Sequence, residues 1–129
     1  MKNSLQLFVV LVFSTLLLGS CDKFLNNSIK NITPIEHLHF DAGSSMKIKA
    51  TFEDKAGLTS FRVRIGNRNG TNSSSFPWEV TENISGESYT FESTPQIPND
   101  IQGTFYIIFE ITNAEGGTSE RFHEFHIDN

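Results

Sequence analysis

The sequence has too few cysteines for a disulfide scaffold, because Cys21 is the only one among its 129 residues. Positive charge is also scarce: 10 lysines and arginines are spread along a chain of net charge −5, so there is no basic stripe to neutralise a phosphate backbone. The sequence contains no Gly-x-Ser-x-Gly elbow and no glycine loop that cradles phosphate. We therefore expect neither a nucleic-acid partner nor an enzyme.

Long apolar runs are equally rare, and the single candidate lies at the N-terminus. The run from Leu5 to Leu18 follows the positive charge of Lys2. It is shorter than the roughly 20 residues that a membrane-spanning helix needs, and it is interrupted by polar residues. A charged start followed by a short apolar run is typical of a secretory signal. We therefore predict that residues 1–20 direct export and are removed.

The end of this run, Leu18-Gly19-Ser20-Cys21, resembles the lipobox of bacterial lipoproteins. The resemblance implies that Cys21 becomes the first mature residue and carries acyl chains such as palmitate. Two or more acyl chains anchor a protein stably to a membrane, so the expected location is the cell envelope, at the outer membrane. Residues 21–31 would form the lipidated cysteine and its tether. The alternative is an ordinary signal peptide, with Cys21 an incidental thiol.

The remaining sequence, residues 32–129, alternates with the period of β-strands. Apolar and charged residues interleave from Ser45 to Glu53, and again from Leu58 to Ile65, where Arg62 and Arg64 would point outward into solvent. These two strands either pair as a hairpin or cross between sheets. The segment from Phe105 to Ile111 is apolar on nearly both faces, which predicts a central strand, and Arg121–Ile127 returns beside it. We predict an antiparallel β-sandwich of immunoglobulin type with about seven strands and an aromatic core.

Several segments of this domain resemble a known family. They are Pro34-Ile35-Glu36-His37, the turn from Glu53 to Leu58, the loop from Ile97 to Gly103, and the segment from Glu110 to Gly116. Together they resemble immunoglobulin-like domains of bacterial lipoproteins, specifically family 4625 of the domains of unknown function, which is found in lipoproteins of the Bacteroidota. The resemblance covers residues 32–129. It implies the fold and the location, and it supplies no activity.

Histidines are concentrated near the two ends of the domain. On a strand, His37 and His39 would share one face about 7 Å apart, a spacing that one metal ion can bridge. The first and last strands of such sandwiches commonly lie side by side, so His126 and Glu124 could complete a site for Zn²⁺ or Cu²⁺. His123 would point to the opposite face. The alternative is that these histidines are simply hydrated or hydrogen-bonded.

Two further features suggest binding. Loops on a rigid sandwich carry recognition, which makes Gly66–Ser75 and Gln96–Gly103, with Trp78 nearby, the candidate surfaces for a protein or glycan partner. The alternative for Trp78 is a place in the core or at its rim. Glu53, Asp54 and Asp100 offer carboxylates for calcium, but turn chemistry explains them equally well. We expect an envelope accessory module without a cofactor, and a Zn²⁺- or Cu²⁺-binding protein as the alternative.

Overall fold

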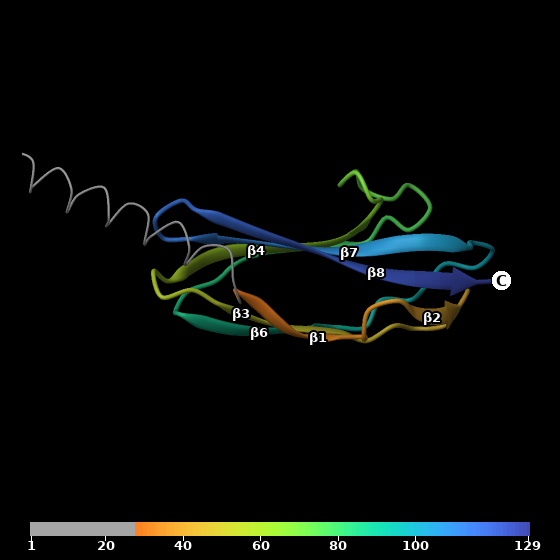
Figure 1. Ribbon diagram of the computed structural model, residues 1–129, viewed down its shortest axis with the longest axis horizontal. Helices are drawn as coiled ribbons and strands as arrows, with labels where there is room; N and C mark the ends of the chain where they lie inside the picture. Colours follow the sequence, from red (N-terminus) through yellow and green to blue (C-terminus); the bar gives the residue numbers. More distant parts are fainter. Residues whose placement is uncertain (1–27) are drawn as a thin grey trace, which may run out of the picture.

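Eight β-strands and no helix make up the part of the chain that the computed structural model describes, residues 28–129 (Figure 1). The strands are β1 (Ile29–Thr33), β2 (Leu38–Asp41), β3 (Ile48–Glu53), β4 (Leu58–Gly66), β5 (Glu79–Asn83), β6 (Ser88–Ser93), β7 (Gly103–Asn113) and β8 (Thr118–Asp128). Within this range there is accordingly no helix that could cross a membrane. The predicted signal peptide and the lipidated Cys21 lie outside the described residues.

The strands form two sheets that stack face to face as the two layers of Figure 1. One sheet has the order β1-β3-β6, and the other has the order β2-β8-β7-β4-β5. The predicted immunoglobulin-type sandwich is therefore confirmed, with eight strands where we expected about seven. β7 lies at the centre of the larger sheet, as its apolar sequence predicted. β3 and β4 belong to different sheets, so the chain crosses between layers at this point.

One pair of strands departs from the expected antiparallel arrangement. β2 runs parallel to β8, with Leu38 opposite Phe125 and Asp41 opposite Asp128. This pairing arises because the chain leaves the smaller sheet after β1 and joins the edge of the larger sheet as β2. Pro34 follows β1 directly and has no N–H group to continue the β1–β3 ladder, which favours an exit at this point.

The sandwich begins earlier in the chain than we predicted. Ile29 is buried in the core and lies opposite Phe52 of β3. β1 thus occupies part of the segment that we assigned to the tether, and the predicted boundary at residue 32 is three residues too late. The sequence pattern did not indicate this strand because it contains the polar residues Lys30 and Asn31, and an edge strand needs few apolar side chains.

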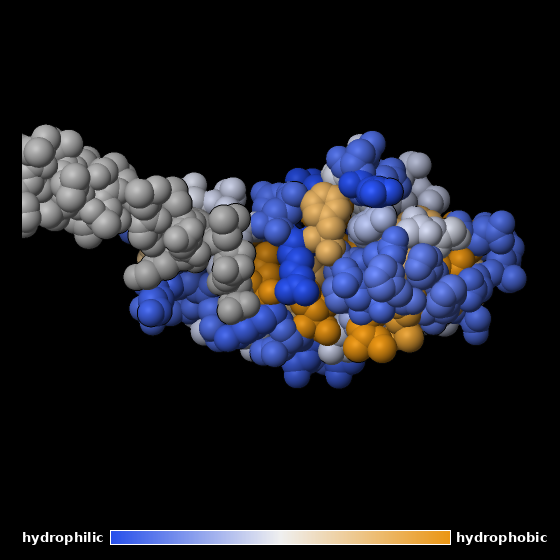
Figure 2. Space-filling model, in the orientation of Figure 1, coloured by the Kyte–Doolittle hydropathy of each residue, from blue (hydrophilic) through white to orange (hydrophobic). Residues whose placement is uncertain are grey.

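Aromatic side chains join the two layers, as predicted. Phe52 of β3 faces the larger sheet, where its ring centroid is 5.5 Å from that of Phe61 and 6.2 Å from that of Phe109. All three are fully buried. Aromatic pairs at these distances add to the gain from burial, so they stabilise a sandwich that has no disulfide. Figure 2 shows hydrophobic residues reaching the surface in the centre of one side, between regions covered by hydrophilic ones.

The loop after β4 is held to the sheet by a buried arginine. The guanidinium of Arg64 donates from Nη1 to the carbonyl of Gly70 at 2.6 Å and to Oδ1 of Asn72 at 2.7 Å. Arg64 was predicted to point into solvent, but it is buried because this loop folds back over it. The loop also buries Ser73, so the segment Gly66–Ser75 is only partly exposed.

Candidate metal centre

The register of three neighbouring strands places a group of polar side chains on the outer face of the larger sheet. His39 of β2 lies opposite His126 of β8, and His126 lies opposite Thr104 of β7. Residues opposite one another in adjacent strands point to the same side of a sheet. The three side chains therefore form one row across the end of the sheet.

A second row lies beside the first. Glu124 of β8 lies opposite Tyr106 of β7, and the backbone N–H of His37 donates to the carbonyl oxygen of Glu124 at 2.8 Å. His37 was predicted to lie on the strand with His39. It instead precedes β2 and has a left-handed backbone conformation, with a φ of 65°, so the two histidines do not share a regular strand spacing.

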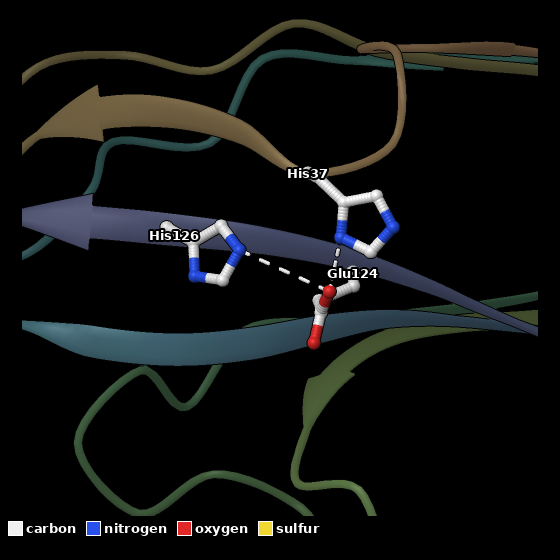
Figure 3. Close-up of side chains that lie close together, drawn as sticks. All are labelled: His37, Glu124 and His126. Carbon is white, nitrogen blue, oxygen red and sulfur yellow. Dashed lines mark ion pairs between the residues drawn. The ribbon is translucent and has the colours of Figure 1, made fainter.

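Three of the four predicted metal ligands come together in this arrangement (Figure 3). One ligand atom from each of His37, Glu124 and His126 lies within 4.8 Å of the other two. His37 Nδ1 and Glu124 Oε2 form an ion pair, and His126 Nε2 lies 3.8 Å from the same oxygen. Two imidazoles and one carboxylate are a ligand set suited to Zn²⁺, and imidazole suits Cu²⁺ as well.

In both Glu124 and His126, the polar side-chain atom that does not face the cluster is hydrogen-bonded to a residue of β7. The hydroxyl of Tyr106 donates to Oε1 of Glu124 at 3.0 Å. This hydrogen bond is the main reason why the pKa of Glu124 is lowered and the pKa of Tyr106 is raised. Thr104 Oγ1 and His126 Nδ1 are hydrogen-bonded at 3.1 Å. Glu124 Oε2 and His126 Nε2 are the atoms left facing the cluster.

The fourth predicted ligand, His39, lies outside this close group. Its ring stacks on that of His126 with 4.8 Å between centroids, and its Nδ1 is 3.0 Å from Oδ2 of Asp128. His39 therefore packs against a ligand and is paired with a carboxylate of its own. An open depression beside it is lined by both rings together with Gln102, Thr104 and Asp128, so this end of the sheet is accessible to solvent.

The fourth histidine of the chain, His123, points to the opposite face of β8. It is buried, and its Nε2 donates to the carbonyl oxygen of Pro34 at 2.5 Å. Burial is the main cause of its lowered pKa. His123 therefore holds the segment between β1 and β2 against the inner side of β8. The residue that it holds, Pro34, lies three positions before His37 in the chain.

The other candidate binding residues have structural surroundings. Trp78 is half-buried against the core, with its ring centroid 6.5 Å from that of Phe91, which matches the core alternative. Asp54 accepts hydrogen bonds from Ala56 N and Asn113 Nδ2, as a turn residue does. Among the described residues, no metal-ligating group of three other than the cluster in Figure 3 lies so close together, so the calcium candidates do not gather.

Sequence reasoning missed Thr104 and Tyr106. Both stand on the strand that we identified as central, where we considered their apolar neighbours only. Their alternation on β7 is visible in the sequence. Their contact with Glu124 and His126 depends on the β7–β8 register, which the turn between these strands fixes.

Comparison with known proteins supports the fold. No family model and no curated protein matches the chain. Among solved structures, it is similar to fibronectin(III)-like modules of Clostridium thermocellum CbhA, with a TM-score of 0.51 and 15% identity. It is also similar to OgpA from Akkermansia muciniphila, with a TM-score of 0.51 and 13% identity.

Both matches involve only part of the other protein. Each covers 78% of this chain, but 45% of the CbhA structure and 29% of the OgpA structure. The chain therefore spans less than half the length of either. At such identities the likeness shows a shared β-sandwich fold and nothing beyond the fold.

Proposed function

We propose that this chain is an envelope accessory module that binds a divalent transition-metal ion, Zn²⁺ or Cu²⁺, through His37, Glu124 and His126. The observation that carries the proposal is the convergence of three ligand atoms within 4.8 Å, from side chains of which two, Glu124 and His126, are hydrogen-bonded through their other polar atom. Metal-binding histidines and carboxylates ordinarily have such outer partners. The exposed side chain of His37, at 65%, leaves one side of the site open to solvent.

Three protein ligands leave one position of a tetrahedral ion free. Structural zinc sites are normally closed by four protein ligands, whereas three ligands and an open position allow exchange with solvent or with another molecule. The arrangement therefore favours reversible binding or transfer of the ion over a purely structural role.

Calorimetric titration of the purified full-length chain with Zn²⁺ and Cu²⁺ tests this function. We expect binding of one ion at micromolar concentration, and its loss in the His37→Ala, His126→Ala double variant. Lys47→Ala provides the matched control, since Lys47 pairs with Glu92 on the exposed face of the other sheet. Absence of heat in the unmodified chain, or equal heat in the double variant, would reject the proposal.

The proposed envelope location rests on the lipobox resemblance at Cys21. Palmitate labelling of cells that express the chain should mark the intact protein and should fail for Cys21→Ala. The labelled protein should fractionate with membranes. Labelling of neither form, together with a soluble protein, would leave the ordinary signal peptide as the better interpretation.

A second candidate function is binding of a protein partner at the β2 edge. The observation that favours it is that Ile35 and Leu38, exposed by 71% and 39%, are the exposed large hydrophobic residues among residues 28–129. They flank His37 at the edge of the larger sheet. Apolar residues favour a protein partner over a glycan at this position. A photo-crosslinker placed at residue 35, and not one at Glu82 in β5, should give a discrete adduct in cells.

A further inference from the structure

We propose that Tyr106 and Thr104 are the positioning residues of the metal site, and that they select a single donor atom on Glu124 and on His126. This inference rests on the proposed function and deepens it. It concerns two residues that would not touch the ion. Their role is to fix the ligands before the ion arrives.

Glu124 has two equivalent oxygens, and Tyr106 makes them different. The Tyr106 hydroxyl donates to Oε1 at 3.0 Å, while Oε2 faces His37 Nδ1 and His126 Nε2. A free carboxylate turns readily about its last side-chain bonds and can bind an ion through either oxygen or both. With Oε1 engaged, Glu124 presents Oε2 alone. The carboxylate is thus prepared to be a one-oxygen ligand.

His126 is oriented by the same strand. A neutral imidazole carries its proton on one ring nitrogen and offers the other as a ligand. The hydrogen bond between Nδ1 and Thr104 Oγ1, at 3.1 Å, engages Nδ1 whichever of the two atoms donates. The other nitrogen, Nε2, faces Glu124 Oε2. Thr104 therefore orients the ring so that Nε2 is the nitrogen presented to an ion.

β7 is well suited to this task because its other face lies in the core. Phe105 and Ile107, which alternate with Thr104 and Tyr106, are buried between the sheets. The Tyr106 ring also packs edge-on against Phe122, with 6.2 Å between centroids. A central strand held on both sides provides rigid support, and sites supported in this way keep their geometry more precisely than sites on loops.

The third ligand has no comparable support. His37 lies before β2 in a left-handed backbone conformation, and its ring pairs with Glu124 alone among the polar contacts of the described residues. Two ligands are therefore arranged in advance, and His37 joins them from the exposed edge. This division predicts that the hydroxyl of Tyr106 contributes to metal affinity even though it lies outside the ligand set.

The test is to measure Zn²⁺ affinity of the full-length chain by competition with a chromophoric chelator. Tyr106→Phe keeps the ring and removes only the hydroxyl, and we expect about a tenfold loss of affinity or more. Tyr89→Phe is the matched control. Tyr89 is the other tyrosine of the chain, and it lies in the smaller sheet, where its ring stacks on that of Phe52. We expect the Tyr89→Phe variant to bind Zn²⁺ with the affinity of the unmodified chain.

Two further measurements separate positioning from packing. In the Glu124→Ala background, Tyr106→Phe should cause no additional loss, because the carboxylate through which it acts is gone. The visible absorption of Co²⁺ bound in place of Zn²⁺ should change in Tyr106→Phe and Thr104→Val, and remain unchanged in Tyr89→Phe. Thermal unfolding of each variant shows whether the fold is retained, and Thr104→Val provides an independent test if Tyr106→Phe does not fold.

The outcomes distinguish this inference from the proposed function. Failure of the unmodified chain to bind Zn²⁺ would reject the metal site itself, and this inference with it. Binding by the unmodified chain with equal affinity and equal Co²⁺ spectra in the Tyr106→Phe and Thr104→Val variants would overturn the positioning role alone. A loss in those variants that is absent from Tyr89→Phe, together with no further loss from Tyr106→Phe in the Glu124→Ala background, would establish it.

Discussion

The two faces of β8 carry histidines in contrasting surroundings. His123 faces the interior, where it is buried and hydrogen-bonded to the carbonyl of Pro34. His126, three residues later, faces outward with its ring 26% exposed and lies in the cluster with Glu124. The period of two in a strand separates them. The comparison shows that the face of the strand, and not the residue type, decides whether a histidine is buried in the fold or lies in the proposed metal site.

The largest effect should come from the inner face. Phe125 lies between the two histidines, is fully buried, and stacks on Phe105 with 5.9 Å between centroids. Phe125→Ala leaves a cavity in the core and should lower the free energy of unfolding by about 3–5 kcal/mol. Chemical denaturation followed by tryptophan fluorescence measures this loss. A change below about 1 kcal/mol would mean that the inner face of β8 contributes less packing than its burial indicates.

The next effect belongs to the outer face. His126→Ala removes a proposed ligand and should reduce Zn²⁺ affinity by at least about 100-fold, more than the loss of an outer-shell partner. The free energy of unfolding of the metal-free protein should change by less than about 0.5 kcal/mol, as for most surface substitutions. Calorimetry and denaturation on one preparation give both values. A large loss of stability with unchanged affinity would reverse the roles assigned to the two faces.

The buried histidine should instead make stability depend on pH. Burial lowers the pKa of His123 below its ordinary value of 6.5. As the pH falls, this histidine is therefore protonated at a higher pH in the unfolded chain than in the folded chain. The free energy of unfolding should therefore fall as the pH decreases below about 6.5. His123→Gln retains a hydrogen-bond donor but does not titrate, so its stability should fall less over the same interval.

Denaturation at several pH values in the presence of a chelator measures this difference. The chelator removes any contribution from a metal ion bound to the cluster on the outer face. Parallel pH profiles for the unmodified chain and His123→Gln would show that His123 is protonated equally well in the folded and unfolded states. That result would contradict the contrast between the two histidines.

The smallest effect is expected for His39→Ala. His39 stacks on His126 but lies outside the group of three ligand atoms. Its removal should lower Zn²⁺ affinity by less than about tenfold, below the loss caused by removing a ligand. Calorimetric titration of His39→Ala and His126→Ala with Zn²⁺ under the same conditions compares the two losses of affinity. Equal losses in the two variants would restore His39 to the ligand set that the sequence predicted.

Much of the fold can be read from local pattern. The alternation around Phe52 and Phe109 predicted strands with aromatic inner faces, and both residues are in the core. The start of β1 was missed because Ile29 is its single buried residue in a polar context. Arg64 was placed in solvent because alternation predicts which face a side chain occupies, while the loop that covers this face is set by long-range contacts.

The candidate site was only partly accessible to the same reasoning. The opposite directions of His123 and His126 follow from the period of a strand, and they are observed. The exclusion of His39 from the close group depends on the backbone conformation of His37, which no spacing rule contains. The supporting roles of Thr104 and Tyr106 depend on strand register. Register comes from the packing of whole strands and not from any motif.

The most direct test of the metal site is anomalous diffraction at the zinc absorption edge, from crystals of the protein grown with Zn²⁺. We predict one strong peak about 2.0–2.2 Å from a nitrogen of His37, a nitrogen of His126 and one oxygen of Glu124. The second oxygen of Glu124 should remain hydrogen-bonded to Tyr106. A zinc peak elsewhere on the molecule, or none at this cluster, would contradict the assignment of the outer face of β8 as a metal centre.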